Sequence, residues 1–177
     1  MLFIASLLFT VSANAAGVNL IVNGSFEDPD IATGSWSVHN AITGWNTIGP
    51  GVEIRDNIVG TAYDGDQFVE LDSHGGVNTN SSIYQTVNTV VGQSYLLSFA
   101  YSPRINQPAA TNGIDVFWNG LQLGATITAT GGGSHNWTIF EYLITGAIGA
   151  NILKFSATGT DDSLGGSLDA VSVSAVP

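Results

Sequence analysis

The chain has 177 residues, no cysteine and a formal net charge of −11, because 14 Asp and Glu outnumber three Lys and Arg. Nucleic acids and anionic membrane surfaces need clustered positive charge, so both are poor partners for this chain, whereas cations and neutral polymers such as glycans remain compatible with it. Without disulfides, the fold must be held by its hydrophobic core, with or without the help of a metal ion.

The first residues have the pattern of a secretory signal peptide. Residues 2–11 are apolar, and the small residues at 12–16 place a cleavage site before Ala16. This run is too short for a membrane-spanning helix, which needs about 20 apolar residues. No Lys or Arg precedes it, and a buried N-terminal strand is the alternative. We expect a signal peptide at 1–15 and a single domain at 16–177.

Apolar and polar residues alternate with period two along most of the chain, and no window of about 11 residues keeps the period of a helix. The alternation predicts about ten strands separated by Gly, Asn and Pro turns. Asn119-Gly120 predicts a tight hairpin turn. The predicted strands are 19–22, 52–55, 67–72, 82–87, 94–101, 113–118, 122–128, 137–144, 151–158 and 168–174.

This pattern predicts an all-β fold in which two antiparallel sheets pack as a β-sandwich of the jelly-roll type. Two loops stand out: 28–51 is long and holds Trp36, His39 and Trp45, and 103–112 is polar and contains Arg104. Long loops on a rigid sandwich are where binding groups usually lie.

Carboxylates near the two ends of the domain suggest a calcium site. Glu27 follows the first predicted strand and Asp169 opens the last one, so they meet at one edge if the end strands are neighbours. Calcium prefers carboxylate and carbonyl oxygens, which the turn at 63–66 also supplies. The alternative is that these acids only cap turns on an acidic surface. The predicted ligand set is Ser25, Glu27, Asp66 and Asp169.

The sequence predicts no enzyme. The three histidines lie in separate polar loops, and the chain has none of the common nucleophile, zinc or phosphate-binding motifs. Glu70 and Asp72 share one face of a strand at about the spacing of a glycosidase pair. Coincidences of this kind are expected among 14 acids, so a weak glycoside-active enzyme is only a third hypothesis.

Glycan binding needs an aromatic face for sugar C–H groups and planar polar groups for hydroxyls. The predicted ligand-binding residues are Trp45, Glu70, Asp72, Tyr101, Arg104 and Trp118. A single Trp is more often a core residue than a sugar platform. Phe117 directly precedes Trp118, so one of the two must face away from the core of a regular strand. The alternative for Arg104 is a salt bridge to Asp115 or another carboxylate.

Seven motifs follow one another along the chain: 19–27, Gly44-Trp45, 69–72, 84–87, 97–104, 118–120 and 162–169. In this order they resemble a bacterial exported family of galactose-binding-like jelly rolls. Members of that family often end in a sorting signal of the PEP-CTERM type, which begins Val-Pro-Glu-Pro; this chain stops at Val176-Pro177, and the signal is absent after Pro177. The chain is also similar to plant cell-wall proteins of the same domain type and, more distantly, to jelly-roll carbohydrate-binding modules.

The resemblance implies a jelly roll with a structural calcium ion at the Phe26-Glu27 and Leu168-Asp169 positions. It also implies a secreted protein of the bacterial cell surface or biofilm matrix. We therefore expect a domain that binds extracellular or cell-wall polysaccharide without catalysis, with no nucleic-acid partner and no stable membrane span in the mature chain. The alternative is a structural matrix protein that associates with itself and has no defined sugar ligand.

Overall fold

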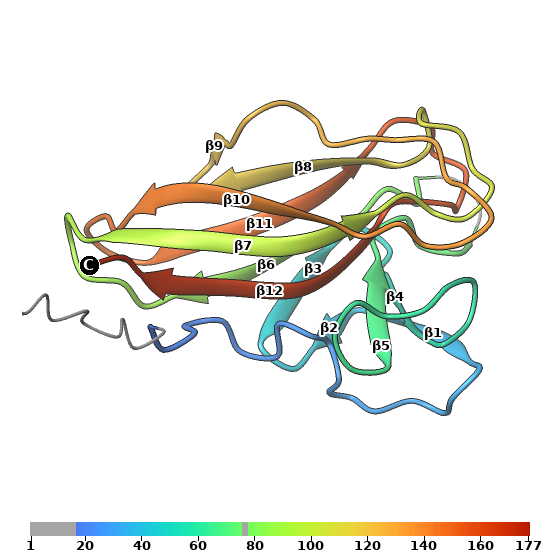
Figure 1. Cartoon of the computed structure of the whole chain (residues 1–177), viewed down its shortest axis with the longest axis horizontal. Helices are drawn as coiled ribbons and strands as arrows, with labels where there is room; N and C mark the ends of the chain where they lie inside the picture. Colours follow the sequence, from blue (N-terminus) through green and yellow to red (C-terminus); the bar gives the residue numbers. More distant parts are fainter. Residues whose placement is uncertain (1–16, 76–77) are drawn as a thin grey trace, which may run out of the picture.

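A computed structural model describes residues 17–75 and 78–177, and the predicted signal peptide lies outside this range. The described residues form two antiparallel sheets that pack face to face (Figure 1). This confirms the predicted all-β jelly-roll sandwich. No helix in the described part of the chain is long and apolar enough to cross a membrane.

Each sheet contains six of the described strands. In spatial order, sheet A consists of β1 (Trp36–His39), β4 (Val52–Asp56), β5 (Gln67–Glu70), β12 (Ser167–Ala175), β7 (Ser94–Ser102) and β10 (Thr138–Thr145). Sheet B consists of β2 (Ala41–Ile42), β3 (Trp45–Ile48), β6 (Ser82–Val87), β11 (Asn151–Thr158), β8 (Gly113–Trp118) and β9 (Leu121–Gln122).

Three parts of the strand prediction are wrong. The segment 28–51, expected as a loop, contains β1, β2 and β3, which are too short to show a clear alternation. The expected strand at 122–128 is reduced to β9 and one bridge between Ile127 and Ile114. The segment 19–22, expected as a strand, lies alongside β12 but is not a strand. The Val173 N–H of β12 donates at 3.0 Å to the side chain of Asn19 and not to a backbone carbonyl.

Aromatic rings join the two sheets through the middle of the core. Phe26 packs on Trp45 with 5.6 Å between ring centroids, and Trp45 lies 6.2 Å from Phe155. Phe155 of sheet B in turn contacts Phe99 of sheet A edge to face at 5.0 Å. All four side chains are buried, so this line of rings ties the N-terminal segment to both sheets.

The predicted hairpin turn is present between β8 and β9. Asn119 and Gly120 both have positive φ, at 52° and 81°, as the twist of a two-residue hairpin requires. The turn reverses the chain directly after Trp118, which fixes that side chain at the end of β8.

The two ends of the described chain lie side by side. The N–H of Leu20 donates to the carbonyl of Val173 at 2.8 Å, and the N–H of Val171 donates to the carbonyl of Gly24 at 2.9 Å. The condition under which Glu27 and Asp169 can meet, that the first and last segments are neighbours, is therefore fulfilled. Their contact brings Glu27 and Asp169 to the same edge of the sandwich.

Trp45→Ala should lower the free energy of unfolding by about 3–5 kcal/mol, because it removes a buried ring from the line between the sheets. Chemical denaturation of both proteins measures this loss. Trp36→Ala is the matched control, since Trp36 is 39% exposed on edge strand β1 and should cost much less. An equal loss of unfolding free energy in the two variants would show that Trp45 does not stabilise the core more than Trp36 stabilises the edge.

Candidate functional site

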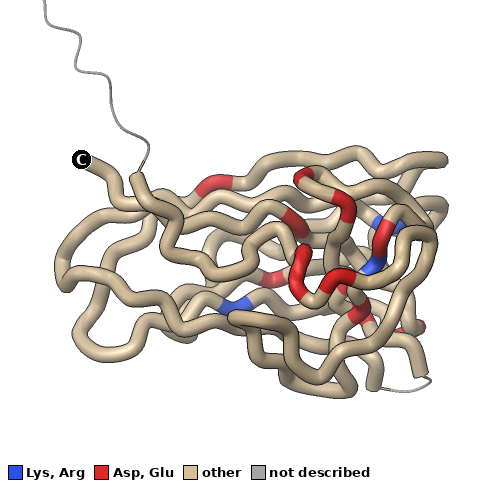
Figure 2. The backbone as a smooth tube through the Cα atoms, turned by 90° about the horizontal axis from the view of Figure 1, so that it is seen from below, with Lys and Arg blue, Asp and Glu red and all other residues tan. Residues whose placement is uncertain are grey.

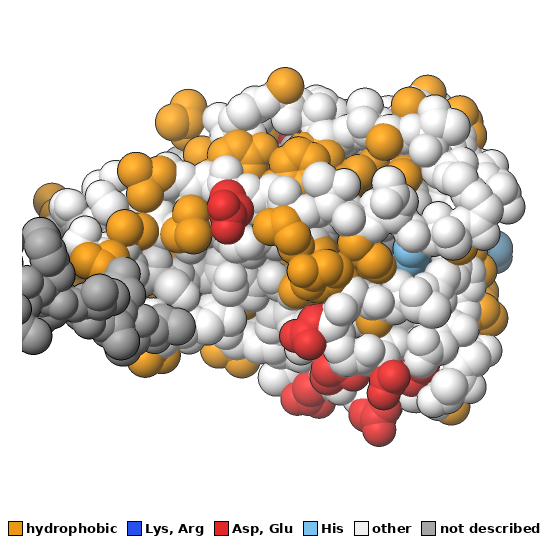
Figure 3. Space-filling model, viewed as in Figure 1, with side chains coloured by type: hydrophobic (Ala, Val, Ile, Leu, Met, Phe, Trp, Pro, Cys, Tyr) orange, Lys and Arg blue, Asp and Glu red, His pale blue; other side chains and the backbone are white. Residues whose placement is uncertain are grey.

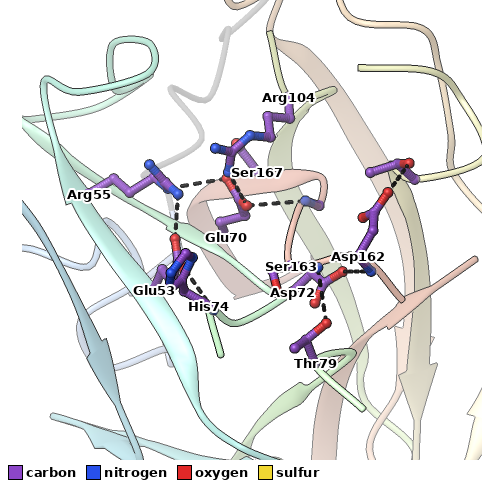
Figure 4. A network of polar contacts seen from close by, with 12 residues as sticks. Glu53, Arg55, Glu70, Asp72, His74, Thr79, Arg104, Asp162, Ser163 and Ser167 are labelled. Atoms are coloured by element: carbon purple, nitrogen blue, oxygen red, sulfur yellow. Dashed lines mark hydrogen bonds and ion pairs between the residues drawn. The ribbon is translucent and has the colours of Figure 1, made fainter. Parts of the chain in front are cut away.

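Buried charged residues of β4, β5 and the loop after β7 form a network (Figure 4). Strands β4 and β5 lie at the end of the sandwich remote from the C terminus (Figure 1). Glu70 binds two arginines: Arg104 Nη1 contacts its Oε1, and Arg55 Nε lies 3.1 Å from its Oε2. Arg55 also pairs with Glu53, and the N–H of Gly165 donates to Glu70 at 3.1 Å. The structure thus brings two predicted ligand residues, Glu70 and Arg104, into direct contact.

Burial raises the pKa of Glu70 to about 7, although the positive charges of Arg55 and Arg104 act in the opposite direction. The carboxyl group is enclosed by its partners and does not face a cleft. The alternative role of Arg104 as a salt-bridge residue is confirmed, with Glu70 and not Asp115 as its partner. This is the arrangement of an internal ion-pair network that holds loops in place.

Asp72 belongs to a second polar group next to this network (Figure 4). Its Oδ2 accepts the N–H of Asp162 at 3.4 Å, and burial raises the pKa of Asp72. Thr79 and Thr111 contribute further bonds: Ser163 N–H donates to Thr79 Oγ1 at 3.1 Å, and Thr111 donates to Asp162 at 3.0 Å. These contacts join three loops and leave Asp72 inaccessible.

Two of the predicted metal ligands, Glu27 and Asp169, converge on one turn, residues 63–67. Glu27 Oε1 accepts the N–H groups of Asp66 and Gln67 at 3.0 and 2.9 Å. Asp169 Oδ2 accepts those of Tyr63 and Asp64 at 2.7 and 3.0 Å. Two carboxylates that are far apart in sequence therefore face one short stretch of backbone.

Gly65 makes this approach feasible, because a Cβ there would collide with the Glu27 carboxylate. The carboxylate of Asp66, however, points toward Asn57, whose amide donates to it at 3.4 Å. Ser25 lines a small hollow of about 190 Å³ beside the turn. As they lie, the predicted ligands do not form a calcium cage, and the described residues contain no group of three or more His, Asp or Glu suited to a metal ion.

Asp169 is fully buried, and this burial raises its pKa to about 7. Its two oxygens accept three backbone N–H groups, from Tyr63, Asp64 and Ala170, which favour the charged form. The residue after it, Ala170, has a positive φ of 48° at a bulge in β12. The bulge directs the carboxylate away from the regular strand and toward the turn.

The three predicted aromatic ligand residues are core residues, which corrects the expectation that they stack on sugars. Trp45 and Tyr101 are each 2% exposed and Trp118 is 6% exposed. The Trp118 indole N–H donates to the carbonyl of Thr145 at 2.9 Å, and the Tyr101 hydroxyl donates to that of Asn112 at 2.9 Å. Their rings and polar atoms are both used inside the sandwich.

Because Trp118 faces inward, its neighbour Phe117 faces outward from sheet B. Phe117 is paired across β11 and β6 with Lys154 and Tyr84, whose side chains are also half-buried on the outer face. The register adds one polar residue at each end. The row runs Asn46, Tyr84, Lys154, Phe117 and Gln122, and we call it the outer row.

The outer row crosses a groove of about 650 Å³. Adjacent strands are about 4.8 Å apart, so the backbone positions of Tyr84 and Phe117 are about 10 Å apart across Lys154. The ammonium of Lys154 lies 4.3 Å from the centre of the Phe117 ring. The aliphatic side chains of Ile48 and Ile152 border the row. Ile148, in the turn between β10 and β11, is 88% exposed. The groove therefore combines two half-buried rings and a cation, and the amides of Asn46 and Gln122 lie outside its lining at the ends of the row.

A second hollow of about 750 Å³ opens at the edge of the sandwich beside β10. Its rings, Phe140 and Tyr142, are stacked on Phe99 with interplanar angles of 15° and 18°. They belong to the rim of the core, because both pack on the buried Phe99. The outer row is the better candidate because its two large rings point out of the sheet.

The outer row was missed because strand register is not visible in a single sequence. The prediction placed Tyr84, Phe117 and Lys154 in the correct strands. Each of these residues is next to a core residue in its strand and therefore points to the opposite face. This alternation was the signal in the sequence that they face outward. Which outward residues become neighbours depends on how β6, β11 and β8 align.

No protein-family model matches the chain. It is 31% identical over 157 residues to a multifunctional-autoprocessing repeats-in-toxin protein of Vibrio vulnificus, and 32% identical over 155 residues to that of Vibrio cholerae serotype O1. Each match covers 86% of this chain but only 3% of the toxin. The chain thus spans a very small part of the length of these relatives.

Solved jelly-roll domains resemble this fold along most of their length. The carbohydrate-binding module TmCBM61, solved with β-1,4-galactotriose, is 17% identical, with a TM-score of 0.58 over 90% of this chain and 99% of that one. A family 35 carbohydrate-binding module from an environmental isolate is 19% identical, with a TM-score of 0.53 over 79% and 92%. A cleaved adhesin domain of Lys-gingipain from Porphyromonas gingivalis W83 is 18% identical, with a TM-score of 0.56 over 82% and 100%. At these identities the likeness shows a common fold.

The raised pKa of Glu70 predicts that stability falls as the pH rises. The folded chain keeps this proton up to a pH of about 7, whereas the unfolded chain loses it near 4.5, so folding takes up a proton between these values. The free energy of unfolding should decrease across this window by up to about 3 kcal/mol. Urea unfolding at several pH values should show a smaller decrease in Glu70→Gln than in wild type, because Asp169, whose pKa is also raised to about 7, still contributes its own part. The same decrease in both proteins would mean that Glu70 stays ionised between its arginines.

Proposed function

We propose that this chain is a non-catalytic carbohydrate-binding module and that its glycan lies along the outer row of sheet B. The observation that carries the proposal is the pair of outward rings, Tyr84 and Phe117, on either side of Lys154. Sugar rings pack their C–H faces on aromatic rings, while amide and ammonium groups bond to hydroxyls. Asn46 supplies an amide at one end of the row; at the other end Gln122 offers its amide oxygen, because its Nε2 already donates to Asp115.

The shape of the row favours an extended ligand. Five residues on five neighbouring strands, about 4.8 Å apart, span about 19 Å across the sheet. A polysaccharide chain that lies perpendicular to the strands contacts all five at once. The strands form the floor of the site, so the rings are held in position before binding, which reduces the entropy cost of association.

The similarity in fold to carbohydrate-binding modules supports this function, and the adhesin domain supports a role in attachment. Extracellular or cell-wall polysaccharide is the proposed partner, and secretion to the bacterial surface or matrix is the proposed location. A catalytic role is less well supported, because Glu70 is bound by two arginines and Asp72 is enclosed by loops.

Calcium stays a prediction for the turn at 63–67. The convergence of Glu27 and Asp169 supports it, because calcium takes carboxylate oxygens and both groups approach from the two ends of the domain. Backbone N–H groups now bind these oxygens, so an ion would have to replace some of these bonds. Its role would be to join the N-terminal segment to β12.

Removing a ring from the outer row should weaken glycan binding without unfolding the domain. Tyr84→Ala and Phe117→Ala should each reduce the affinity about tenfold, since a stacked ring contributes roughly 1–2 kcal/mol. Retention in native gels that contain neutral or acidic polysaccharides measures the change. Phe140→Ala, at the edge hollow, is the matched control and should leave retention unchanged.

Loss of retention in Phe140→Ala alone would move the site to the edge hollow. A chain that binds no glycan but forms oligomers as its concentration rises would favour the structural alternative. Strand β10 would then be the contact, since it ends sheet A and exposes Ile139 and Leu143 beside Leu96 of β7. Figure 3 shows hydrophobic side chains spread across this face.

Calcium binding should appear as thermal stabilisation. An ion present at about 100 times its dissociation constant adds about 2.7 kcal/mol to the free energy of unfolding. The melting temperature in EDTA should rise when calcium is added, and magnesium should have a much smaller effect. Glu27→Gln and Asp169→Asn should each remove the rise. No rise in wild type would mean that both carboxylates only cap the amides of the turn.

A further inference from the structure

Lys154 differs from the other cationic residues of the chain. Arg55 and Arg104 are both bound to Glu70, deep in the polar network. Lys154 is the single lysine, and no described carboxylate lies within 4.0 Å of its ammonium group. In a chain with 14 acids, a half-buried lysine without an ion-pair partner is a feature that needs a reason.

The surroundings of Lys154 hold its ammonium in the groove. Its Nζ lies over the Phe117 ring, and Tyr84 flanks it on the opposite strand. The one acid in the described strands of sheet B is Asp115, two residues before Phe117 on β8. Asp115 Oδ1 is already engaged, because it accepts Gln122 Nε2 at 3.0 Å and Thr126 Oγ1 at 2.6 Å. The aromatic ring and not an acid therefore positions the lysine.

The high negative charge of the chain does not act strongly at this groove. Asp and Glu residues gather toward the end remote from the C terminus, where two of the three cationic positions also lie (Figure 2). Lys154 is in the middle of β11, outside the loops that carry most of these acids. Charges beyond about 8 Å are largely screened at physiological ionic strength.

We infer that the ligand of the outer row carries carboxylates, so that the module selects an acidic polysaccharide over its neutral counterpart. This inference rests on the proposed function, since it assigns the ligand of the same site. A sugar carboxylate that enters between Tyr84 and Phe117 meets the one cation that lacks an internal partner. The rings hold the sugar face, and the ammonium binds the carboxylate by a charge-assisted hydrogen bond.

The test compares matched polysaccharides that differ only in charge. Polygalacturonate, alginate and hyaluronan, each with its carboxyl-reduced form, are placed in native affinity gels with the full chain. At least one acidic form should bind about tenfold more tightly than its reduced form. Lys154→Gln should lose this preference but keep the weaker neutral binding, and Lys154→Arg should keep the preference. Asp115→Asn controls for a hidden pair with Lys154 and should change nothing.

Equal binding of acidic and reduced forms would overturn the inference, and so would a preference that survives in Lys154→Gln. If Tyr84→Ala still abolishes that equal binding, the proposed function stands and only the acidic ligand is wrong. If none of the six polysaccharides binds to the wild type, both the inference and the proposed function fail. Near-ultraviolet circular dichroism of each variant separates loss of binding from loss of fold.

Discussion

The contact between Phe155 and Phe99 joins the two sheets, and much of the molecule follows from it. Once these rings and Trp45 face inward, the alternation of side chains along each strand determines which residues face outward. In β11, Phe155 in the core places Lys154 on the outer face. In β8, Trp118 in the core places Phe117 outside. The packing of the interior and the composition of the outer row are therefore two results of one constraint.

The loop end of the sandwich and the outer face of sheet B are built differently. At the end remote from the C terminus, buried ion pairs and hydrogen bonds join loops that would otherwise be free. Such a network contributes little net stability compared with apolar packing, but it penalises arrangements that leave Glu70 or Arg55 without a partner. The face of sheet B is built only from strands and carries no comparable network among the described residues. The network that orders the loops and the proposed ligand site therefore lie in separate regions of the sandwich.

The sequence was sufficient for the fold class and for most strands, because period-two alternation is a local property. It was also sufficient to place the chain ends side by side, with Glu27 and Asp169 at one edge. It failed for the aromatic ligands, since whether Trp118 or Phe117 faces outward depends on the opposite sheet. It failed for the outer row because register is a property of pairs of strands. Tryptophan is the usual first candidate for a sugar platform, but here Trp118 is buried and the smaller ring of Phe117 faces outward.

The pairing of the N-terminal segment with β12 also has a mechanical meaning. Gly17 lies against Ala175, and the two segments run antiparallel from there toward Gly24 and Val171. A force that pulls these two ends apart would load their bonds one after another and not all together, so the segment would peel from β12 at low force. The peeling would reach the turn that receives Glu27 and Asp169 only after the preceding bonds had broken. Under tension, the hydrogen bonds between the N-terminal segment and β12 would therefore break before the strands of sheet B separate.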